Sequence, residues 1–266
     1  MKHSARAVVL QSLHAEAPVM SAFQSRRDAP RANILARAFD ALAMGTFPLV
    51  ATVLGYRVRV GATPELRADA RDVLAQVWRA EGVSPSEDAR WVEERYDAAT
   101  TWVVVSHRGR PVGVVGVLDM RIACLSLDFE MRVPPPGMDL ATTREVARLA
   151  ILPSHQRGDQ LVLVALLHQV LTLCRRAGVR TLMGGSTRNL FELYRRFNPA
   201  AQIIHPPAKT HEPPELTQYF APLRAYSAGR GVLFTFDLGA ASPWHVFSRL
   251  VKNRVRHLWR GFRRSQ

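Results

Sequence analysis

Lysine, cysteine and apolar runs of membrane-spanning length are all scarce in this 266-residue chain. Only three lysines occur, so arginine supplies almost all of the net charge of +14, a bias typical of GC-rich bacterial genomes. The two cysteines, Cys124 and Cys174, cannot form a disulfide framework, which indicates a reducing compartment. No Cys or Cys/His spacing is typical of structural zinc, so we expect no metal site.

An uncharged stretch at residues 41–56 is too short to cross a membrane. It has 16 positions, and Gly45 and Pro48 interrupt it, whereas a spanning helix needs about 20 apolar residues. We therefore expect a buried or interfacial helical hairpin there. His14 and Glu16 interrupt the first apolar run, which disfavours a secretory signal. The expected location is the cytoplasm, including the inner face of the cytoplasmic membrane.

The positive charge that is present gathers at the C-terminal end. Residues 242–266 contain seven basic residues and no acidic one, which is half of the net charge. Ser242 followed by Pro243 is typical of a helix start, and aromatic residues then recur on one helical face. This pattern predicts a helix that lies on an anionic membrane surface. The residues expected to contact that membrane are Trp244, Phe247, Arg254, Trp259, Arg260 and Phe262.

Two other interpretations of this basic tail compete with membrane binding. A terminal helix that packs on the protein with a solvated basic face explains the pattern equally well. Nucleic-acid binding is disfavoured, because no recognised reader motif accompanies the charge.

Between the two ends, the sequence predicts one α/β domain over residues 56–240. An extension at 1–55 precedes it and the tail at 241–266 follows it. Apolar strands alternate with helices, which predicts a mixed sheet with helices on both faces. The strands are expected at 56–60, 101–106, 111–118, 142–152, 180–183, 202–204 and 231–238, and the helices at 63–77, 160–177 and 188–197. Residues 86–95 fit a helix or a loop, and the stretch before the Pro-Pro-Pro-Gly at 134–137 reads as irregular.

Three stretches carry a resemblance to a known superfamily. An acidic stretch, WVEERYD at 91–97, precedes a strand hairpin; EVARLA at 145–150 has an E-x-x-R-hydrophobic pattern; STRNLFELYRRF at 186–197 ends in Tyr-Arg-Arg. In this order and spacing, the chain resembles the GNAT acyltransferases. Within them it is most similar to acyl-homoserine-lactone synthases and bacterial long-chain N-acyl amino acid synthases. The resemblance implies a mostly antiparallel sheet with a splayed cleft for an acyl-pantetheine thioester.

One departure from the superfamily pattern concerns the acyl donor. Ordinary acetyl-CoA enzymes of this kind have R/Q-x-x-G-x-G/A at the start of the long helix, where backbone N–H groups hold the pyrophosphate. Here Gln160 and Val162 fill both glycine positions. The resemblance therefore implies acyl carrier protein, or else CoA, as the thioester co-substrate, with no permanently bound cofactor. A basic chain suits an acidic carrier protein.

The resemblance also implies roles for particular residues. Amide formation needs a base for the amine, donors for the oxyanion and a proton for the leaving thiolate. Glu145 would be the base, directly or through a water, and Tyr194 the acid. Arg148 would hold an acceptor carboxylate or support Glu145, and Asp97, with Glu93 and Glu94, would attract the acceptor ammonium. The donor would be held by the backbone of Leu149, Ala150 and Ile151 and by Gln156, Arg157 and Gly158.

Each of these roles has a simpler alternative. Glu145 and Arg148 lie three residues apart, so on a regular strand they point to opposite faces unless a bulge changes the register. Tyr194 fits equally into the apolar face of its helix, and the acidic residues near Asp97 fit a solvated helix end.

The function expected from these observations is N-acyl transfer of a long-chain acyl group to an amine, such as an amino acid or a lipid amine, at a membrane surface. The alternatives are acetyl-CoA-dependent N-acetylation and a degenerate acyltransferase domain that only binds a membrane or a carrier protein.

Overall fold

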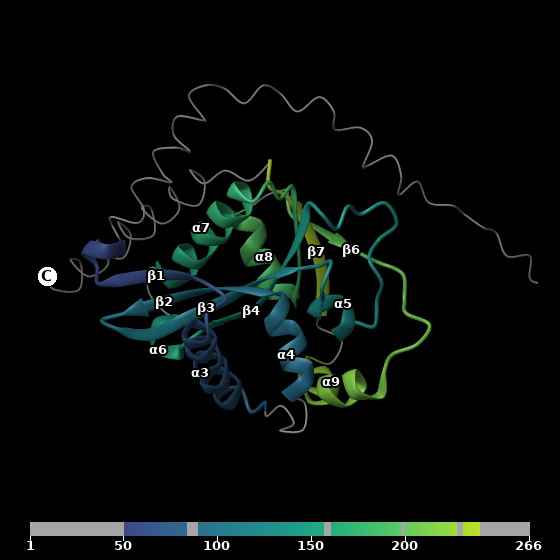
Figure 1. Ribbon diagram of the computed structural model, residues 1–266, viewed down its shortest axis with the longest axis horizontal. Helices are drawn as coiled ribbons and strands as arrows, with labels where there is room; N and C mark the ends of the chain where they lie inside the picture. Colours follow the sequence, from purple (N-terminus) through teal and green to yellow (C-terminus); the bar gives the residue numbers. More distant parts are fainter. Residues whose placement is uncertain (1–50, 84–89, 157–160, 198–199, 228–230, 240–266) are drawn as a thin grey trace, which may run out of the picture.

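A single twisted sheet organises the part of the chain that the computed structural model describes (Figure 1). The described residues are 51–83, 90–156, 161–197, 200–227 and 231–239. Most of the expected N-terminal extension and the whole of the basic tail lie outside these ranges, so both stay predictions.

Seven strands form the sheet in the order β1-β2-β3-β4-β5-β7-β6. Their bounds are β1 Tyr56–Gly61, β2 Thr100–His107, β3 Arg110–Asp119, β4 Thr143–Ile151, β5 Thr181–Thr187, β6 Gln202–Ile204 and β7 Gly231–Asp237. All neighbours pair antiparallel except β4 and β5, which run parallel. The expected mixed, mostly antiparallel sheet is confirmed, and every expected strand is present.

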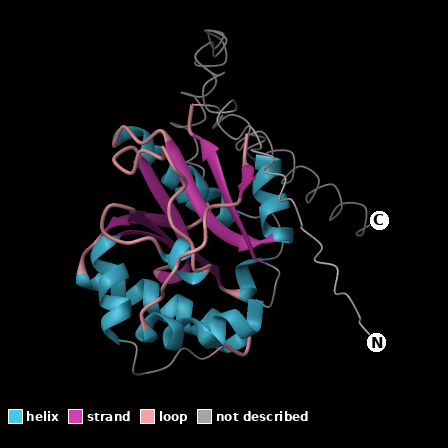
Figure 2. Ribbon diagram, turned by 90° about the vertical axis from the view of Figure 1, so that its right-hand side faces the viewer, coloured by secondary structure: helices cyan, strands magenta, loops and turns pink. Residues whose placement is uncertain are grey.

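Helices cover both faces of this sheet (Figure 2). One layer contains α7 (Leu161–Arg176) and α8 (Arg188–Phe197), which Figure 1 shows on the opposite side of the strands from α3 and α9. The other layer contains α3 (Pro64–Ala80), α4 (Arg90–Ala99), α5 (Leu125–Phe129) and α9 (Pro214–Ser227), and α6 is a single turn at Pro153–Gln156. The largest buried cluster lies between α7 and the sheet, and smaller clusters lie under α3 and under α4 with α9.

Local chemistry explains the helices that the sequence predicts. At the start of α3, the Thr63 hydroxyl accepts the backbone N–H of Leu66, and Pro64 occupies a first-turn position. The apolar helix α7 packs on β2 and β3. It lies so close that a Cβ at Gly113 would stand 2.3 Å from Val162 Cγ1. Gly178, with φ of +70°, follows its C-terminus.

Two helices differ from the expectation. The stretch before residues 134–137 contains α5, which is only five residues long, and residues 214–227 form α9, for which no helix was expected. A five-residue helix leaves no periodic apolar pattern to recognise. The helix α9 has Pro222 in its interior, which argues against a helix from sequence.

The sheet opens between its two parallel strands. β4 pairs with β5 only over Thr143–Glu145 and Thr181–Met183, after which β5 continues alongside β7. Gly184 lies where the two strands part, and a Cβ there would stand 2.8 Å from the carbonyl oxygen of Val146. The expected splay is therefore present, and a side chain larger than hydrogen does not fit at its apex.

Candidate active site

A bulge in β4 decides which residues face the splay. The β3–β4 register shifts between Val114 and Gly116, and Arg148 takes a left-handed backbone conformation with φ of +55°. For a residue other than glycine this conformation costs about 1–3 kcal/mol. Owing to the bulge, Glu145, Ala147 and Arg148 all face the same layer of helices. Glu145 contacts α5, Ala147 packs in the cluster under α4 and α9, and Arg148 contacts α4.

Arg148 forms a buried ion pair with Asp97 of α4. The guanidinium Nη1 donates to Asp97 Oδ1 at 2.8 Å, and the two side chains are 4% and 0% exposed. The guanidinium carbon lies 5.7 Å from the ring centre of Tyr96 and 5.5 Å from that of Trp102, a cation–π arrangement. Asp97 Oδ2 also accepts from Arg71 Nε at 3.0 Å. Asp97 is therefore saturated by arginines, which leaves it poorly placed to bind an acceptor ammonium.

Part of the Arg148 guanidinium remains without a partner. Its Nε and Nη2 are buried, and no hydrogen-bond acceptor reaches them from the described residues. A buried charged donor that lacks an acceptor costs at least about 1–3 kcal/mol. Arg148 also lines a cavity, so its positive charge faces a space in which an anion could bind.

This cavity has a volume of about 280 Å³ and lies at the mouth of the β4–β5 splay. Its walls come from β4, β5, the start of β7, α5, α9 and the C-terminal part of α3. Most lining side chains are apolar or aromatic, and two are charged, Glu130 and Arg148. The lining residues are Trp78, Leu125, Ser126, Phe129, Glu130, Ala147, Arg148, Gly185, Ser186, Thr187, Tyr219, Leu223 and Gly231.

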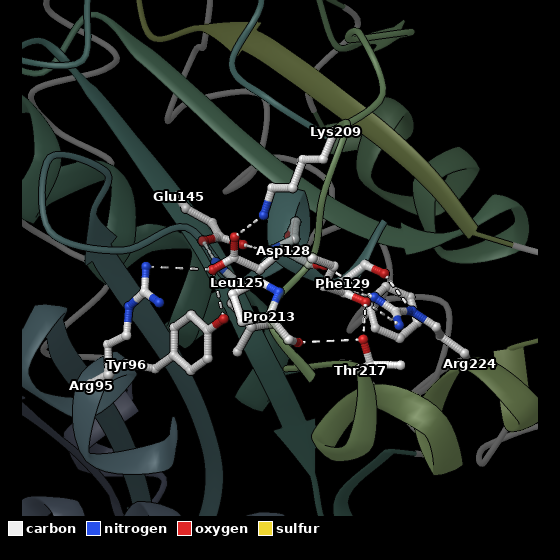
Figure 3. A network of polar contacts seen from close by, with 12 residues as sticks. Arg95, Tyr96, Leu125, Asp128, Phe129, Glu145, Lys209, Pro213, Thr217 and Arg224 are labelled. Atoms are coloured by element: carbon white, nitrogen blue, oxygen red, sulfur yellow. Dashed lines mark hydrogen bonds and ion pairs between the residues drawn. The ribbon is translucent and has the colours of Figure 1, made fainter. Parts of the chain in front are cut away.

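Glu145 lies beneath this cavity and does not line it. The carboxylate is fully buried, and each oxygen accepts a backbone N–H of α5, from Leu125 and from Ser126, both at 2.6 Å (Figure 3). Burial raises the pKa of Glu145, and the N–H donors oppose that rise only in part. In this arrangement Glu145 holds the start of α5 against β4, so a direct role as base for the acceptor amine finds no geometric support.

The same short helix is held at two further points (Figure 3). Asp128 accepts the Tyr96 hydroxyl at 2.7 Å and pairs with the Lys209 ammonium. At the end of the helix, Arg224 Nε donates to the Phe129 carbonyl at 2.9 Å. These contacts join α4, α9 and the loop before α9 to the wall of the cavity.

Tyr194 lies on the other side of the sheet. It belongs to α8, and its ring centre is 5.6 Å from that of Phe234, within the cluster that also contains Phe191. Burial raises the pKa of Tyr194. The structure does not bring this hydroxyl to the cavity, and its surroundings match those of a core residue.

The expected donor-binding residues are placed in part. Leu149, Ala150 and Ile151 belong to β4 beyond the point where β5 pairs with it, so their backbone borders the splay. The Gln156 side chain donates to the Ile151 carbonyl at 2.7 Å. Arg157 and Gly158 lie outside the described residues, as do the side chain of Glu93 and all six expected membrane contacts of the tail, from Trp244 to Phe262.

Several residues of the cavity were not expected from the sequence, above all Glu130. It follows α5 directly, inside the stretch that reads as irregular. The one available signal was an acidic residue next to the partly apolar pentapeptide LSLDF, and that signal does not distinguish a cavity wall from a surface turn. Trp78 and Phe129 are aromatic residues of short or partly polar helices. Aromatic residues are as common in hydrophobic cores as in cavity walls, so the sequence does not single these two out.

Comparisons with known proteins identify the fold. No family model and no curated protein matches the sequence. The AHL synthase LasI is similar in structure, with a TM-score of 0.50 at 15% identity over 73% of this chain and 95% of that one. FeeM, an N-acyl amino acid synthase from uncultured soil microbes, gives a TM-score of 0.45 at 15% identity over 69% of this chain and 91% of that one. N-acetylglutamate synthase from Neisseria gonorrhoeae gives 0.40 at 17% identity over 69% and 35%.

The likeness to LasI shows that this chain has the GNAT fold. Two further findings concern the described residues alone. None of the helices there has the length and apolar character needed to cross a membrane. Within the same residues, no three His, Cys, Asp or Glu side chains come together as a metal site.

Proposed function

We propose that this protein is an N-acyltransferase that moves a long-chain acyl group from an acyl carrier protein or acyl-CoA thioester to an amine that also carries a carboxylate. The observation that carries this proposal is the cavity at the β4–β5 splay, which is lined by Arg148, a residue with two unpaired guanidinium nitrogens buried next to it. A planar guanidinium with free N–H groups fits a carboxylate through two parallel hydrogen bonds.

The fold supports the acyl-transfer part of the proposal. LasI, the structure that matches at a TM-score of 0.50, is an AHL synthase. In this chain the acyl thioester would enter between the diverging strands, where the backbone of Leu149–Ile151 borders the gap. Backbone N–H groups there would stabilise the oxyanion when the amine attacks the thioester carbon. The carbon–sulfur bond then breaks, and the sulfur leaves as the thiol.

The size and lining of the cavity support a small acceptor. A volume of about 280 Å³ lies just below the usual range for small-molecule sites, about 300–1,000 Å³. Trp78, Phe129 and Leu223 line it, so an acceptor with an apolar side chain would bury that side chain there. Glu145 then has a positioning role, because it fixes the helix that supplies one wall.

The test is acyl transfer by the purified full chain. Acetyl and long-chain acyl thioesters of CoA and of acyl carrier protein are each offered with two sets of acceptors, the apolar amino acids and the amines that correspond to them without the carboxylate. Mass spectrometry detects the amide. We expect long-chain N-acyl amino acids in preference to N-acetyl products and to acylated simple amines.

Arg148→Gln should remove the preference for the carboxylate-bearing acceptor, by about 10-fold or more, since a good charged hydrogen bond contributes about 1.5–3 kcal/mol. Arg121→Gln is the matched control, because Arg121 is exposed and pairs only locally with Asp119. Transfer that is confined to acetyl groups would support the acetyltransferase alternative, and absence of transfer to every acceptor would refute the proposal.

A further inference from the structure

The cavity contains the carboxylate of Glu130, which no sequence pattern indicated and which has no other role in the proposed reaction. Glu130 directly follows α5, is half buried and lines the cavity. Among the described residues its carboxylate has no hydrogen bond and no ion pair, whereas its backbone N–H donates to the Ser126 carbonyl. The carboxylates of Glu145, Asp97 and Asp128 all have strong partners.

The start of β7 keeps space open for this carboxylate. A Cβ at Gly231 would stand 2.5 Å from Glu130 Oε1, well inside the contact distance of real side chains. Gly231 lines the same cavity. The absence of a side chain at this position therefore lets the Glu130 carboxylate lie against the cavity wall.

The other acidic groups near the cavity are closed to a substrate. Glu145 is fully buried, with both oxygens on the N–H groups of α5, and Asp97 is enclosed by arginines. Of the residues that line the cavity, Glu130 is the one with a carboxylate. A general base must reach the proton that it removes, so accessibility favours Glu130 over the other two.

We infer that Glu130 is the catalytic base that takes the proton of the acceptor ammonium, and this inference rests on the proposed N-acyl transfer. The ammonium gives one proton to the Glu130 carboxylate, and the freed nitrogen lone pair forms the new bond to the thioester carbon. The tetrahedral intermediate loses the second nitrogen proton to the departing sulfur, which leaves as a thiol. Glu130 finally releases its proton to water.

Glu130 and Arg148 together give the cavity two poles of opposite charge. Arg148 would hold the acceptor carboxylate, while Glu130 would receive the ammonium. Since the remaining wall is largely apolar, the cavity fits a zwitterion with an apolar side chain. The role of Glu130 as a base does not require that Arg148 selects acceptors with a carboxylate, so the two roles are tested independently.

The test compares two acceptors that differ in protonation. One is the amino acid that the wild-type chain acylates best, which is an ammonium at neutral pH. The other is O-benzylhydroxylamine, an apolar alkoxyamine that is already unprotonated at that pH and needs no base to free its lone pair. Each is measured as kcat/KM with the wild-type chain, Glu130→Gln and the matched control Glu215→Gln, an exposed carboxylate of α9 that does not line the cavity.

Glu130→Gln should lower kcat/KM for the amino acid by about 10²–10⁴-fold, the usual contribution of a general base. For O-benzylhydroxylamine the loss should stay below about 10-fold. Raising the pH should restore part of the lost rate with the amino acid, because more of it is then free amine. Glu215→Gln should match the wild type on both acceptors.

Gly231→Ala provides a second variant that keeps the charge. Its added Cβ would displace the Glu130 carboxylate, so the loss should again be selective for the amino acid. Equal losses on both acceptors in Glu130→Gln, or no loss, would overturn the assignment while the proposed function stands. A wild-type chain that acylates neither acceptor would refute the proposed function itself and this assignment with it.

Discussion

The ion pair between Arg148 and Asp97 predicts a strong energetic coupling between β4 and α4. Both side chains are almost fully buried, and the two groups join positions that are 51 residues apart. At an effective dielectric constant of about 20, unit charges about 4 Å apart attract by about 4 kcal/mol. Desolvation offsets part of this, so we expect a coupling energy of about 2–3 kcal/mol, near the upper end for residues in contact.

A double-mutant cycle measures this coupling. Arg148→Met keeps most of the side-chain volume but leaves Asp97 in a buried site with fewer partners, and removing one member of a buried pair costs about 3–5 kcal/mol. For a chain of this size that corresponds to a fall of roughly 6–20 °C in melting temperature. Asp97→Asn should also destabilise, because it leaves the guanidinium of Arg148 buried without its charge partner.

The double variant Arg148→Met with Asp97→Asn should then be more stable than the sum of the two losses predicts. Urea unfolding of the four proteins gives the coupling energy directly. Arg59→Met with Asp69→Asn is a control cycle on an exposed pair, for which we expect less than about 1 kcal/mol. Strict additivity in the Arg148–Asp97 cycle would show that the pair is not formed, and would return Asp97 to consideration as an acceptor-binding residue.

Three further predictions follow from other parts of the structure. Burial raises the pKa of Glu145 above its usual value of 4.5, so the stability that this residue contributes is present below about pH 4.5 and is lost as the pH rises through the raised pKa. In urea unfolding from pH 4.5 to 8, the difference in free energy of unfolding between the wild type and Glu145→Gln should therefore become smaller as the pH rises. A difference that grows with pH would contradict this. Gly184→Ala should cost about 1–3 kcal/mol in the same assay, because its Cβ meets backbone at the splay, and an unchanged stability would refute the close approach. Deletion of residues 242–266 should abolish flotation with vesicles of anionic lipid, and a truncated chain that floats as well as the full one would exclude the tail as the anchor.

The site depends on a backbone feature as much as on side chains. The bulge at Arg148 costs free energy, and it moves the guanidinium to the face where Asp97, Tyr96 and Trp102 surround it. Strain at one residue is retained where the surrounding packing determines the conformation. In this chain the strained residue also lines the cavity and has two buried, unpaired guanidinium nitrogens, so structure and proposed function meet at the same position.

The helix α5 shows how few residues can build a cavity wall. Its first N–H groups are held by Glu145, its Asp128 by Tyr96 and Lys209, and its last carbonyl groups by Arg224. A helix of five residues is not stable by itself, because nucleation is costly. Its stability comes from these long-range partners, which explains why the local sequence predicts no helix there.

The sequence alone determined the positions of the strands and of the long helix α7, because alternation and helical periodicity are local properties that burial imposes on neighbouring residues. The E-x-x-R motif is likewise visible in the sequence. These patterns also led to the GNAT resemblance, which the fold confirms. Tertiary structure decided the rest of the site. The register shift in β4 put Arg148 on the face of Glu145, the partner from α4 closed off Asp97, and the packing of α8 placed Tyr194 against Phe234. Glu130 reached the cavity only through the anchoring of α5 and the space left at Gly231. These outcomes depend on contacts between residues far apart in the chain, and local periodicity carries no information about such contacts.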